Sequence, residues 1–325
     1  MVSVIIPVYN VEAYIERCVR SLMEQTLTDI EYIFVDDCST DASVMVLKRA
    51  LEEYPARKGF VKLMEKKENE GVAAARKTGL DLSIGKYIIH CDSDDWVAKN
   101  MYQTLYEEAE RSHADCVLCD YYVTDGTTHK SNCYTYKDRH GLLSDLLSYK
   151  RGGSLCCYLV KRELYEKVVF PKKHMWEDLA VSIQLFYYAS NIVKINEALY
   201  FYYQNPTSVS YEPSLESSIK RLEESKQNID LIEEFLRRNE IADTYKSELT
   251  SLKYYSKFFI SKYTSRTEIR ALWRNTFKEI NLRIFFDRHI PLEVKAKHIL
   301  LYTGLFPIFK SFTSKRGTTY EAVGQ

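Results

Sequence analysis

The sequence has no long hydrophobic run and no excess of charge of either sign. No stretch of its 325 residues approaches the roughly 20 apolar residues that a membrane-spanning helix needs. The N-terminal segment Met1–Pro7 has no basic residues ahead of its short apolar run, unlike a signal peptide. Lysine plus arginine total 45, as do aspartate plus glutamate, and this balance argues against nucleic acid as the main partner. We therefore expect a cytoplasmic protein, or one at the cytoplasmic face of the membrane.

Glycine-rich nucleotide-binding motifs are also missing. No G-x-G-x-x-G follows any predicted strand, and this absence argues against a dinucleotide-dependent oxidoreductase. The loop after the first predicted strand, Pro7–Glu12, contains no glycine and carries a negative charge. A sugar-phosphate nucleotidylyltransferase needs a glycine-rich, basic loop there to hold a triphosphate, so that enzyme stays only as an alternative.

The eight cysteines do not predict a metal site. Cys116 and Cys119 make a C-x-x-C, but they lie in Asp115–Tyr121, which is predicted to be a strand. Residues three apart in a strand point to opposite faces, so zinc binding is not expected there. In a chain kept in the cytoplasm, all eight are expected to be free thiols.

Three short apolar runs near the N-terminus predict strands that are buried on both faces of a sheet. The runs are Val2–Val8, Tyr32–Val35 and Tyr87–His90, and they are nearly continuous rather than alternating. Helical patterns lie between and after them, at Glu12–Glu24, Ser43–Glu53, Val72–Leu82 and Lys99–Ser112. This order of strands and helices is typical of a doubly wound α/β fold with a mostly parallel sheet.

The pattern changes twice farther along the chain. From Asp125 it loosens into short strands and helices, and after Pro213 the apolar residues keep a helical period. We therefore expect one domain over residues 1–213 and a helical region over residues 214–325.

Acidic residues follow two of the predicted strands. Asp36 and Asp37 come after the second, and Asp92-Ser93-Asp94-Asp95 comes after the third. In open α/β sheets, ligands bind beyond the carboxyl ends of the strands. Residues i and i+2 of an extended segment point the same way, so Asp92 and Asp94 can address one Mg²⁺ or Mn²⁺ ion. The alternative is an Asx turn in which Asp94 or Asp95 caps the next helix.

Two further motifs each have a functional and a structural interpretation. Asn69-Glu70-Gly71 opens a helix whose amides, together with Arg76, can bind an anion; otherwise it is an ordinary helix start with a surface arginine. Glu177-Asp178 begins an amphipathic helix and offers a proton acceptor; otherwise it is an acidic first turn favoured by the helix dipole. The residues alone leave both questions open.

In order and spacing, these motifs resemble the family 2 glycosyltransferases, which have the GT-A fold. The matching segments are Val4–Asn10, Asp36–Asp41, Asn69–Gly71 with Ala75-Arg76, Asp92–Asp95, Val160–Arg162, Glu177–Leu179 and Tyr200–Tyr203. The resemblance covers about residues 2–210. It implies a GT-A catalytic domain with a donor-binding part at about 1–122 and an acceptor side at about 123–213.

The resemblance also implies a role for each matched residue. Pro7, Val8 and Tyr9 would line the pocket for the base, with Glu12 nearby, and Asp37 would bind the imide of the base. Asn69, Gly71, Arg76 and Ser93 would complete the nucleotide-sugar site. Asp92 would lie near the ribose, and Asp94, with Asp92, would hold the metal on the diphosphate. Asp178 would be the catalytic base with Glu177 beside it. Lys77 departs from the family, where asparagine is common, so the donor sugar stays open.

The implied activity is inverting, metal-dependent transfer of a hexosyl or N-acetylhexosaminyl group. The expected donor is a nucleotide sugar, with a UDP-sugar favoured, and the expected acceptor is a hydroxyl of a saccharide or lipid-linked saccharide. The setting would be bacterial surface polysaccharide biosynthesis, with Mn²⁺ or Mg²⁺ as cofactor. None of the three tryptophans follows an arginine, so the Gln-x-x-Arg-Trp motif of processive relatives is missing and one sugar should be added at a time. A non-catalytic relative that binds nucleotide sugars or glycans is a further alternative, although Asp94 and Asp178 are both present.

The C-terminal region contains an apolar stretch bracketed by cations. Ile299–Tyr302 and Leu305–Phe309 lie between Lys295, Lys297 and His298 on one side and Lys310, Lys315 and Arg316 on the other. Such a stretch can make a peripheral contact with an anionic membrane surface, or it can close the domain as a packed helix. Both interpretations stay open.

Overall fold

The computed structural model describes residues 1–205, 214–287 and 290–305. Internal contacts divide the chain into two compact units. The first is Met1–Arg139 with Ser154–Pro206, and the second is His140–Gly153 with Thr207–Gln325. The sequence pattern places segment 140–153 in the first domain, whereas the contacts group it with the helical unit.

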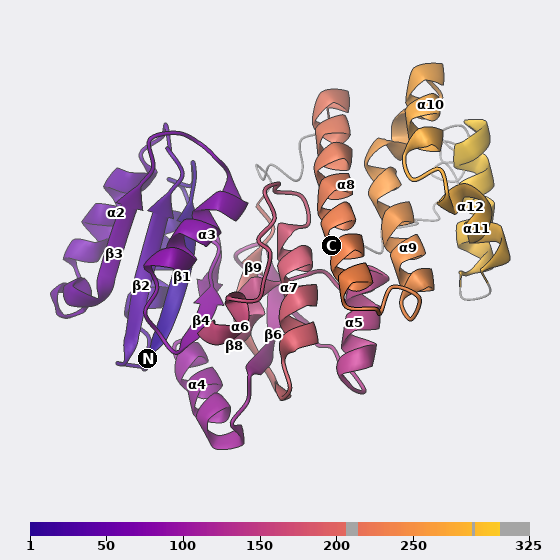
Figure 1. Ribbon diagram of the computed structural model, residues 1–325. Coiled ribbons are helices and arrows are strands. Elements are labelled where there is room, and N and C mark those ends of the chain that lie inside the picture. The colour runs from indigo at the N-terminus through magenta and orange to yellow at the C-terminus, as the bar shows by residue number, and fades with distance from the viewer. Residues whose placement is uncertain (206–213, 288–289, 306–325) are drawn as a thin grey trace. The chain divides into compact units, whose positions relative to one another are not determined.

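The first unit is built on one mixed sheet (Figure 1). Within the described residues its nine strands are β1 (Val2–Val8), β2 (Ile30–Asp36), β3 (Val61–Glu65), β4 (Tyr87–His90), β5 (Trp96–Val97), β6 (Cys116–Thr124), β7 (His129–Asn132), β8 (Tyr158–Lys161) and β9 (Ile192–Tyr203). Their order is β3-β2-β1-β4-β8-β6-β9-β5, and β7 pairs with β6. β1 runs parallel to β2 and β4, and β2 runs parallel to β3.

Helices cover this sheet and connect its strands. They are α1 (Ile15–Met23), α2 (Ser43–Glu52), α3 (Val72–Leu82), α4 (Met101–Ser112), α6 (Arg162–Tyr165) and α7 (Glu177–Tyr188), with the 3₁₀ turns η1 (Pro55–Phe60) and η2 (Leu155–Cys157). α3 packs on β1 and β2, and α4 packs on β6, β8 and β9. A Cβ at Gly79 would overlap Cγ2 of Ile5, so α3 approaches β1 this closely only because residue 79 is glycine.

The burial of the central strands agrees with the sequence pattern. β1 and β2 are buried along their whole length, as continuous apolar runs predict. The parallel register pairs Val8 with Asp36, so both strands end at the same edge of the sheet. The predicted α/β fold is confirmed, with β5, β7 and β8 running antiparallel to the strands they pair with. All eight cysteines are free thiols, as expected.

The second unit is helical where it is described. It contains α5 (Arg139–Leu147), α8 (Leu215–Arg238), α9 (Lys246–Ser256), the 3₁₀ segment η4 (Lys257–Tyr263), α10 (Thr267–Asn275), α11 (Ile280–Phe286) and α12 (Leu292–Thr303). Across residues 1–205, 214–287 and 290–305, no helix is both long and apolar enough to cross a bilayer. The unit keeps a polar group in its core, since Lys257 is fully buried and its Nζ lies 4.0 Å from the ring centre of Trp273.

His298 is not one of the cations that bracket the C-terminal apolar stretch, contrary to the expectation from the sequence. Its side chain is only 1% exposed. Burial, with the nearby charge of Lys257, lowers the pKa of His298 to about 4, so its ring is neutral at pH 7. The bracketing cations Lys310, Lys315 and Arg316 lie outside the described residues, as does the segment from Phe306 to Phe309.

Candidate active site

The loops after β1 and β2 hold each other in place. The Asn10 N–H donates to Ser39 Oγ (3.1 Å), and Asn10 Oδ1 accepts from the Thr40 N–H (2.9 Å). Asn10 has a φ of 51°, a left-handed conformation that asparagine tolerates. Glu12 Oε2 accepts from the Ala42 N–H (2.8 Å). The carboxylate of Glu12, predicted to lie near the base, therefore also ties the two loops together.

The three residues predicted to line the base pocket differ in accessibility. Pro7 and Val8 lie in the buried strand β1, and Val8 has no exposed surface. Tyr9 follows the strand and is 43% exposed. An aromatic ring offers a flat ligand such as a nucleobase a face to stack on. Tyr9 is therefore the side chain of this segment that a base can reach.

Asp37 is buried and its carboxylate is saturated by neighbours. Oδ1 accepts from Lys66 Nζ (2.8 Å) and from the Glu70 N–H (3.1 Å), and Oδ2 accepts from the Gly71 N–H (2.5 Å). Lys66 also pairs with Glu70 (2.6 Å). Asp37 thereby fixes the loop that leads into α3. No sequence motif points to Lys66, although its place directly after β3 puts it at the same edge of the sheet.

The start of α3 is in contact with the segment that leads into α7. Gly71 has a φ of +89°, and a Cβ there would overlap the ring of His174. Both the backbone conformation and the packing of the His174 ring thus require glycine at position 71. No pattern in the sequence distinguishes His174. Asn69, in contrast, lies exposed in the preceding loop.

Arg76 joins the end of β4 to the start of α7. Its side chain is 5% exposed, its NH2 donates to Asp92 Oδ1 (2.6 Å), and its NH1 lies 3.2 Å from Glu177 Oε1. Burial alone would lower the pKa of Arg76. The negative charges of Asp92 and Glu177 outweigh burial, so the pKa of Arg76 lies well above its ordinary value. The surface-arginine interpretation is therefore wrong. Lys77, the residue that departs from the family pattern, is half exposed and pairs with Asp81 instead.

Asp94 is held by residues from the two ends of the first unit. Its Oδ2 accepts from Asn205 Nδ2 (3.1 Å), and its backbone carbonyl accepts from Arg17 NH2 (2.9 Å). Asn205 in turn accepts from Tyr14 Oη (3.1 Å). Burial and the adjacent charge of Asp92 raise the pKa of Asp94. No sequence pattern points to Asn205, since a lone asparagine after a strand has no distinctive spacing.

Asp95 does not cap a helix, so the capping alternative is wrong for this residue. It is 1% exposed, and its carboxylate accepts from Tyr200 Oη (2.5 Å) and the Tyr203 N–H (2.7 Å) on β9. Burial and the charges of Asp94 and Asp92 raise the pKa of Asp95 well above its ordinary value. Asp95 therefore fastens the acidic turn, including buried Ser93, to β9.

The acidic turn fits a divalent cation that also binds substrate. The described residues contain no group of three or more His, Cys, Asp or Glu side chains able to enclose a metal. Mg²⁺ and Mn²⁺ commonly bind through one or two carboxylates and take their other ligands from phosphates and water. Asp94 and Asp92 are two such carboxylates, and a cation would relieve the repulsion that raises the pKa of Asp94.

Glu177 and Asp178 form the first turn of α7 and differ in acidity. Burial raises the pKa of Glu177 to about 8, with Asp178 and Asp92 adding to the rise against the effect of Arg76. Burial also raises the pKa of Asp178, to about 6, while Arg76 and the Leu179 N–H, which donates to Oδ1 (2.7 Å), lower it. Asp178 is therefore the carboxyl group of the pair that ionises more readily near pH 7, and Glu177 is the weaker acid. This separation of two neighbouring carboxyl groups is typical of a catalytic pair.

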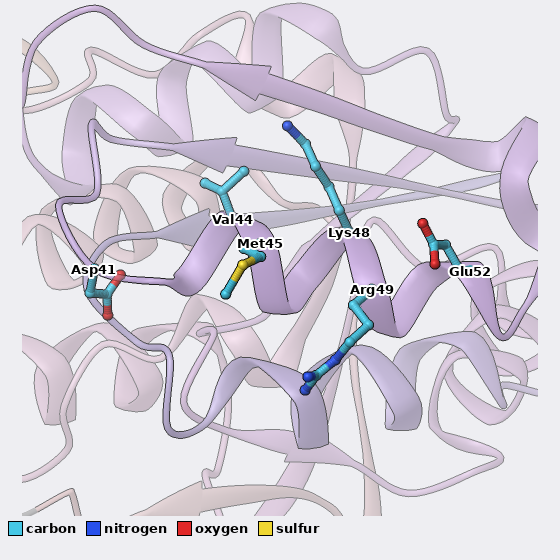
Figure 2. Close-up of a pocket in the computed structure, with 6 residues that line it drawn as sticks. All are labelled: Asp41, Val44, Met45, Lys48, Arg49 and Glu52. Carbon is cyan, nitrogen blue, oxygen red and sulfur yellow. The ribbon is translucent and has the colours of Figure 1, made fainter.

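A hollow of about 560 Å³ lies elsewhere on the first unit. Figure 2 shows its lining side chains, which come from α2 and the turn before it: Asp41, Val44, Met45, Lys48, Arg49 and Glu52. Arg49 pairs with Glu16, and Lys48 pairs with Glu65. No predicted site residue lines this hollow, so it is separate from the acidic turn and α7.

The comparisons with known proteins identify the family. The sequence profile described as "Glycosyl transferase family 2" matches residues 3–168, which include the loops after β1, β2 and β4. The chain belongs to glycosyl transferase family 2. It is 32% identical to the uncharacterized glycosyltransferase EpsJ of Bacillus subtilis, over 70% of this chain and 68% of that protein. It is therefore a glycosyltransferase, and the nucleotidylyltransferase and the non-catalytic relative are set aside.

Solved structures of glycosyltransferases agree with the architecture. TarS of Staphylococcus aureus, residues 1–349, in complex with UDP-GlcNAc, aligns with a TM-score of 0.57 at 17% identity, over 98% of this chain and 93% of that one. The mannosyltransferase PcManGT from Pyrobaculum calidifontis, in complex with GDP-Man and Mn²⁺, aligns with a TM-score of 0.57 at 16% identity, over 97% and 87%. The glycosyltransferase therefore has the GT-A fold that its motifs imply.

Proposed function

We propose that this glycosyltransferase transfers a single sugar, with inversion, from a UDP-sugar to a hydroxyl of a saccharide or lipid-linked saccharide. The observation that carries the proposal is the buried guanidinium of Arg76, which contacts Asp92 at the metal side and Glu177 beside the proposed base. Arg76 thereby links the turn that would bind the donor, at Asp92, to the first turn of α7, where Asp178 would activate the acceptor. The expected setting is synthesis of a bacterial surface polysaccharide.

The donor half rests on the strand-end loops. Tyr9 is accessible for stacking with a base, while Asp37 and Glu12 hold the loops around it. TarS was solved with UDP-GlcNAc and PcManGT with GDP-Man, which supports a nucleotide sugar for a chain of this fold. We favour a uridine nucleotide because TarS, which has the same fold, was solved in complex with UDP and with UDP-GlcNAc.

The metal half rests on Asp94, with Asp92 beside it. A divalent cation held there would neutralise the negative charge that develops on the departing diphosphate. Asn205 and Arg17 fix the turn, and Asp95 ties it to β9, so the carboxylate of Asp94 is held in place before substrate binds. The complex of PcManGT with Mn²⁺ supports this assignment for the fold.

The acceptor half rests on Asp178. The acceptor hydroxyl must lose its proton as it attacks the sugar carbon, and the pKa of about 6 leaves Asp178 ionised at pH 7 and a stronger base than an ordinary carboxylate. Glu177, whose pKa is raised further, is less available than Asp178 as an ionised base at that pH. Arg76, which contacts Glu177, would hold the first turn of α7 in its orientation. Attack from the face opposite the leaving diphosphate inverts the anomeric configuration.

The test is a panel of nucleotide sugars incubated with the full chain, with and without Mn²⁺. We expect a UDP-sugar to raise the melting temperature in the presence of Mn²⁺ and to be slowly hydrolysed to UDP. A chain that neither binds nor hydrolyses any nucleotide sugar would contradict the proposed donor. Long homopolymers formed from one donor and a short acceptor would contradict transfer of a single sugar.

A further inference from the structure

Two neighbouring helices of the second unit have an apolar outer face. α11 exposes Leu282 (71%) and Phe286 (84%), and α12 exposes Leu292 (81%) and Ile299 (50%). Among the described residues, seven of the fourteen exposed large hydrophobic side chains lie between residues 282 and 305. The seven, which we call the apolar face, are Leu282, Phe285, Phe286, Leu292, Ile299, Tyr302 and Leu305. An exposed apolar patch of this density marks an interaction surface.

Each of these helices is apolar on two sides. α12 buries His298 and Leu301, and α11 buries Ile280 and Ile284. At about 100° per residue, Leu292 and Ile299 lie on one side of α12 and Leu301 lies opposite them. A helix that only packs on its own domain presents a polar outer side. The exposed side chains therefore are not the edge of the packed core but a second, separate stripe.

The exposed apolar stripe of α11 and that of α12 belong to one surface. Lys295 Nζ on α12 donates to the Phe285 carbonyl on α11 (3.1 Å), and the rings of Phe285 and His298 lie 5.4 Å apart. Figure 1 shows the two helices side by side at the yellow end of the chain. Contacts across the pair thus hold the outer residues of both helices within reach of a single partner.

The sequence around the apolar face is positively charged. The described residues between 274 and 305 include five lysines and arginines and three aspartates and glutamates, whereas the whole chain is balanced at 45 each. Arg283 is exposed between Leu282 and Phe286, and Lys297 lies on α12 with its Nζ 4.0 Å from the ring centre of Phe258. Apolar side chains mixed with cations match the acyl chains and head groups of an anionic bilayer.

We propose that the apolar face docks on the surface of an anionic lipid bilayer, with its hydrophobic side chains in the interface and its cations at the head groups. α11 and α12 are 7 and 12 residues long, so they lie in the interface rather than cross it. The proposal goes beyond the transfer reaction, because it needs neither donor nor catalytic residues.

Charge favours an anionic bilayer over two other partners for the apolar face, a second copy of the chain and the chain's own C-terminal segment. A second copy of the chain would bring the same positive excess to the apolar face, and like charges at an interface are unfavourable. The chain's own segment 306–325 adds three lysines and arginines and one glutamate, so it also fails to neutralise the face. An anionic lipid surface is complementary in both charge and polarity.

The test is flotation of the full chain with vesicles of phosphatidylcholine alone or mixed with phosphatidylglycerol, at low and high salt. The test variant is Leu282→Ser with Phe286→Ser. The matched control is Met45→Ser with Ile84→Ser, two residues of the first unit that are 65% and 66% exposed. We expect the wild type and the control to float with the mixed vesicles, more strongly at low salt. The test variant should lose at least about tenfold in binding, because two large side chains no longer enter the interface.

Three results would overturn the proposal. One is failure of the wild type to bind mixed vesicles, and another is equal binding by the test variant and the control. The third is a dimer, seen by sedimentation velocity, that the test variant abolishes while neither the wild type nor the control floats. Melting curves of all variants check that the fold is intact. Since no nucleotide sugar is present, a negative result leaves the proposed transferase activity unaffected, and the reverse holds for a failed donor screen.

Discussion

The carboxylates at the end of β2 and those at the end of β4 and the start of α7 have opposite surroundings. Asp37, after β2, accepts three hydrogen bonds from Lys66, Glu70 and Gly71. Within residues 1–205, 214–287 and 290–305, Asp94 accepts from one side chain, the amide of Asn205, and burial and the charge of Asp92 raise its pKa. The same pattern, an aspartate after a buried strand, thus serves two purposes. A saturated carboxylate builds a loop, whereas we propose that the carboxylates with fewer donors bind a cation or a proton.

The largest effect is expected at Asp178. Asp178→Asn keeps the shape of the side chain and removes its basicity, so kcat should fall about a hundred- to ten-thousandfold. Donor affinity should barely change, because the donor half uses the strand-end loops. For the wild type, kcat should fall as pH drops through about 6, where Asp178 gains a proton. The measurements are kcat against pH, donor affinity, and the anomeric configuration of the product by NMR.

A retained anomeric configuration, or near-normal turnover of Asp178→Asn, would contradict the role of Asp178. The raised pKa of Asp178 also has a consequence for the stability of the fold. Because burial raises the pKa of Asp178 from 3.8 to about 6, stability is lost as the pH rises between these two values, and the whole loss is present at pH 7. The asparagine variant should therefore melt at a temperature equal to or above that of the wild type at pH 7.

The next effect is at Asp94. Asp94→Asn should lower the transfer rate by about a hundred- to thousandfold, as loss of a preorganised charge at a reacting centre does. EDTA should reduce the wild type to a similar level. The control is Asp81→Asn, whose carboxylate is 60% exposed in a surface pair with Lys77 and should change neither rate nor stability. Full activity in EDTA would exclude the metal assignment.

Stability should respond most to Arg76. Arg76→Met leaves the buried carboxyl group of Glu177 and the partly exposed carboxylate of Asp92 without their cation. Removing one partner of a fully buried pair costs about 3–5 kcal/mol, and because Asp92 is partly exposed we expect a loss of about 3 kcal/mol. Urea unfolding measures this loss. Adding Glu177→Gln should recover part of it. Arg20→Met, the control, removes a solvent-accessible arginine that pairs with Glu16 and Glu53 and should change stability much less. An equal loss of unfolding free energy in Arg76→Met and Arg20→Met would show that Arg76 does not stabilise the contact between the end of β4 and the start of α7.

The smallest effect on the chemical step is expected at Asp37. Asp37→Asn should weaken the loop before α3 and cost about 1–3 kcal/mol, because buried donors lose their acceptor. The KM for the donor should rise while kcat changes little. If Asp37→Asn lowered kcat as much as Asp94→Asn does, the proposed division between a loop-building aspartate after β2 and a metal-binding aspartate after β4 would be wrong.

The fold was predictable because it follows from patterns of burial, and the candidate site was chosen from the same patterns. Continuous apolar runs predicted the parallel strands, and acidic residues after them predicted the functional edge. The state of each carboxylate was not predictable, because it depends on distant donors: Lys66 for Asp37 and Asn205 for Asp94. His174 was missed for the same reason, since its packing on Gly71 joins residues about a hundred positions apart.

The measurement that tests the difference between the strand ends most directly is a titration of Mn²⁺ in the presence of UDP, followed by electron paramagnetic resonance. It should be made on the wild type, Asp94→Asn and Asp37→Asn. We expect Asp37→Asn to bind Mn²⁺ as the wild type does at saturating UDP, and Asp94→Asn to lose the bound ion. Mn²⁺ binding by Asp94→Asn equal to that of the wild type would contradict the assignment of the metal to the end of β4.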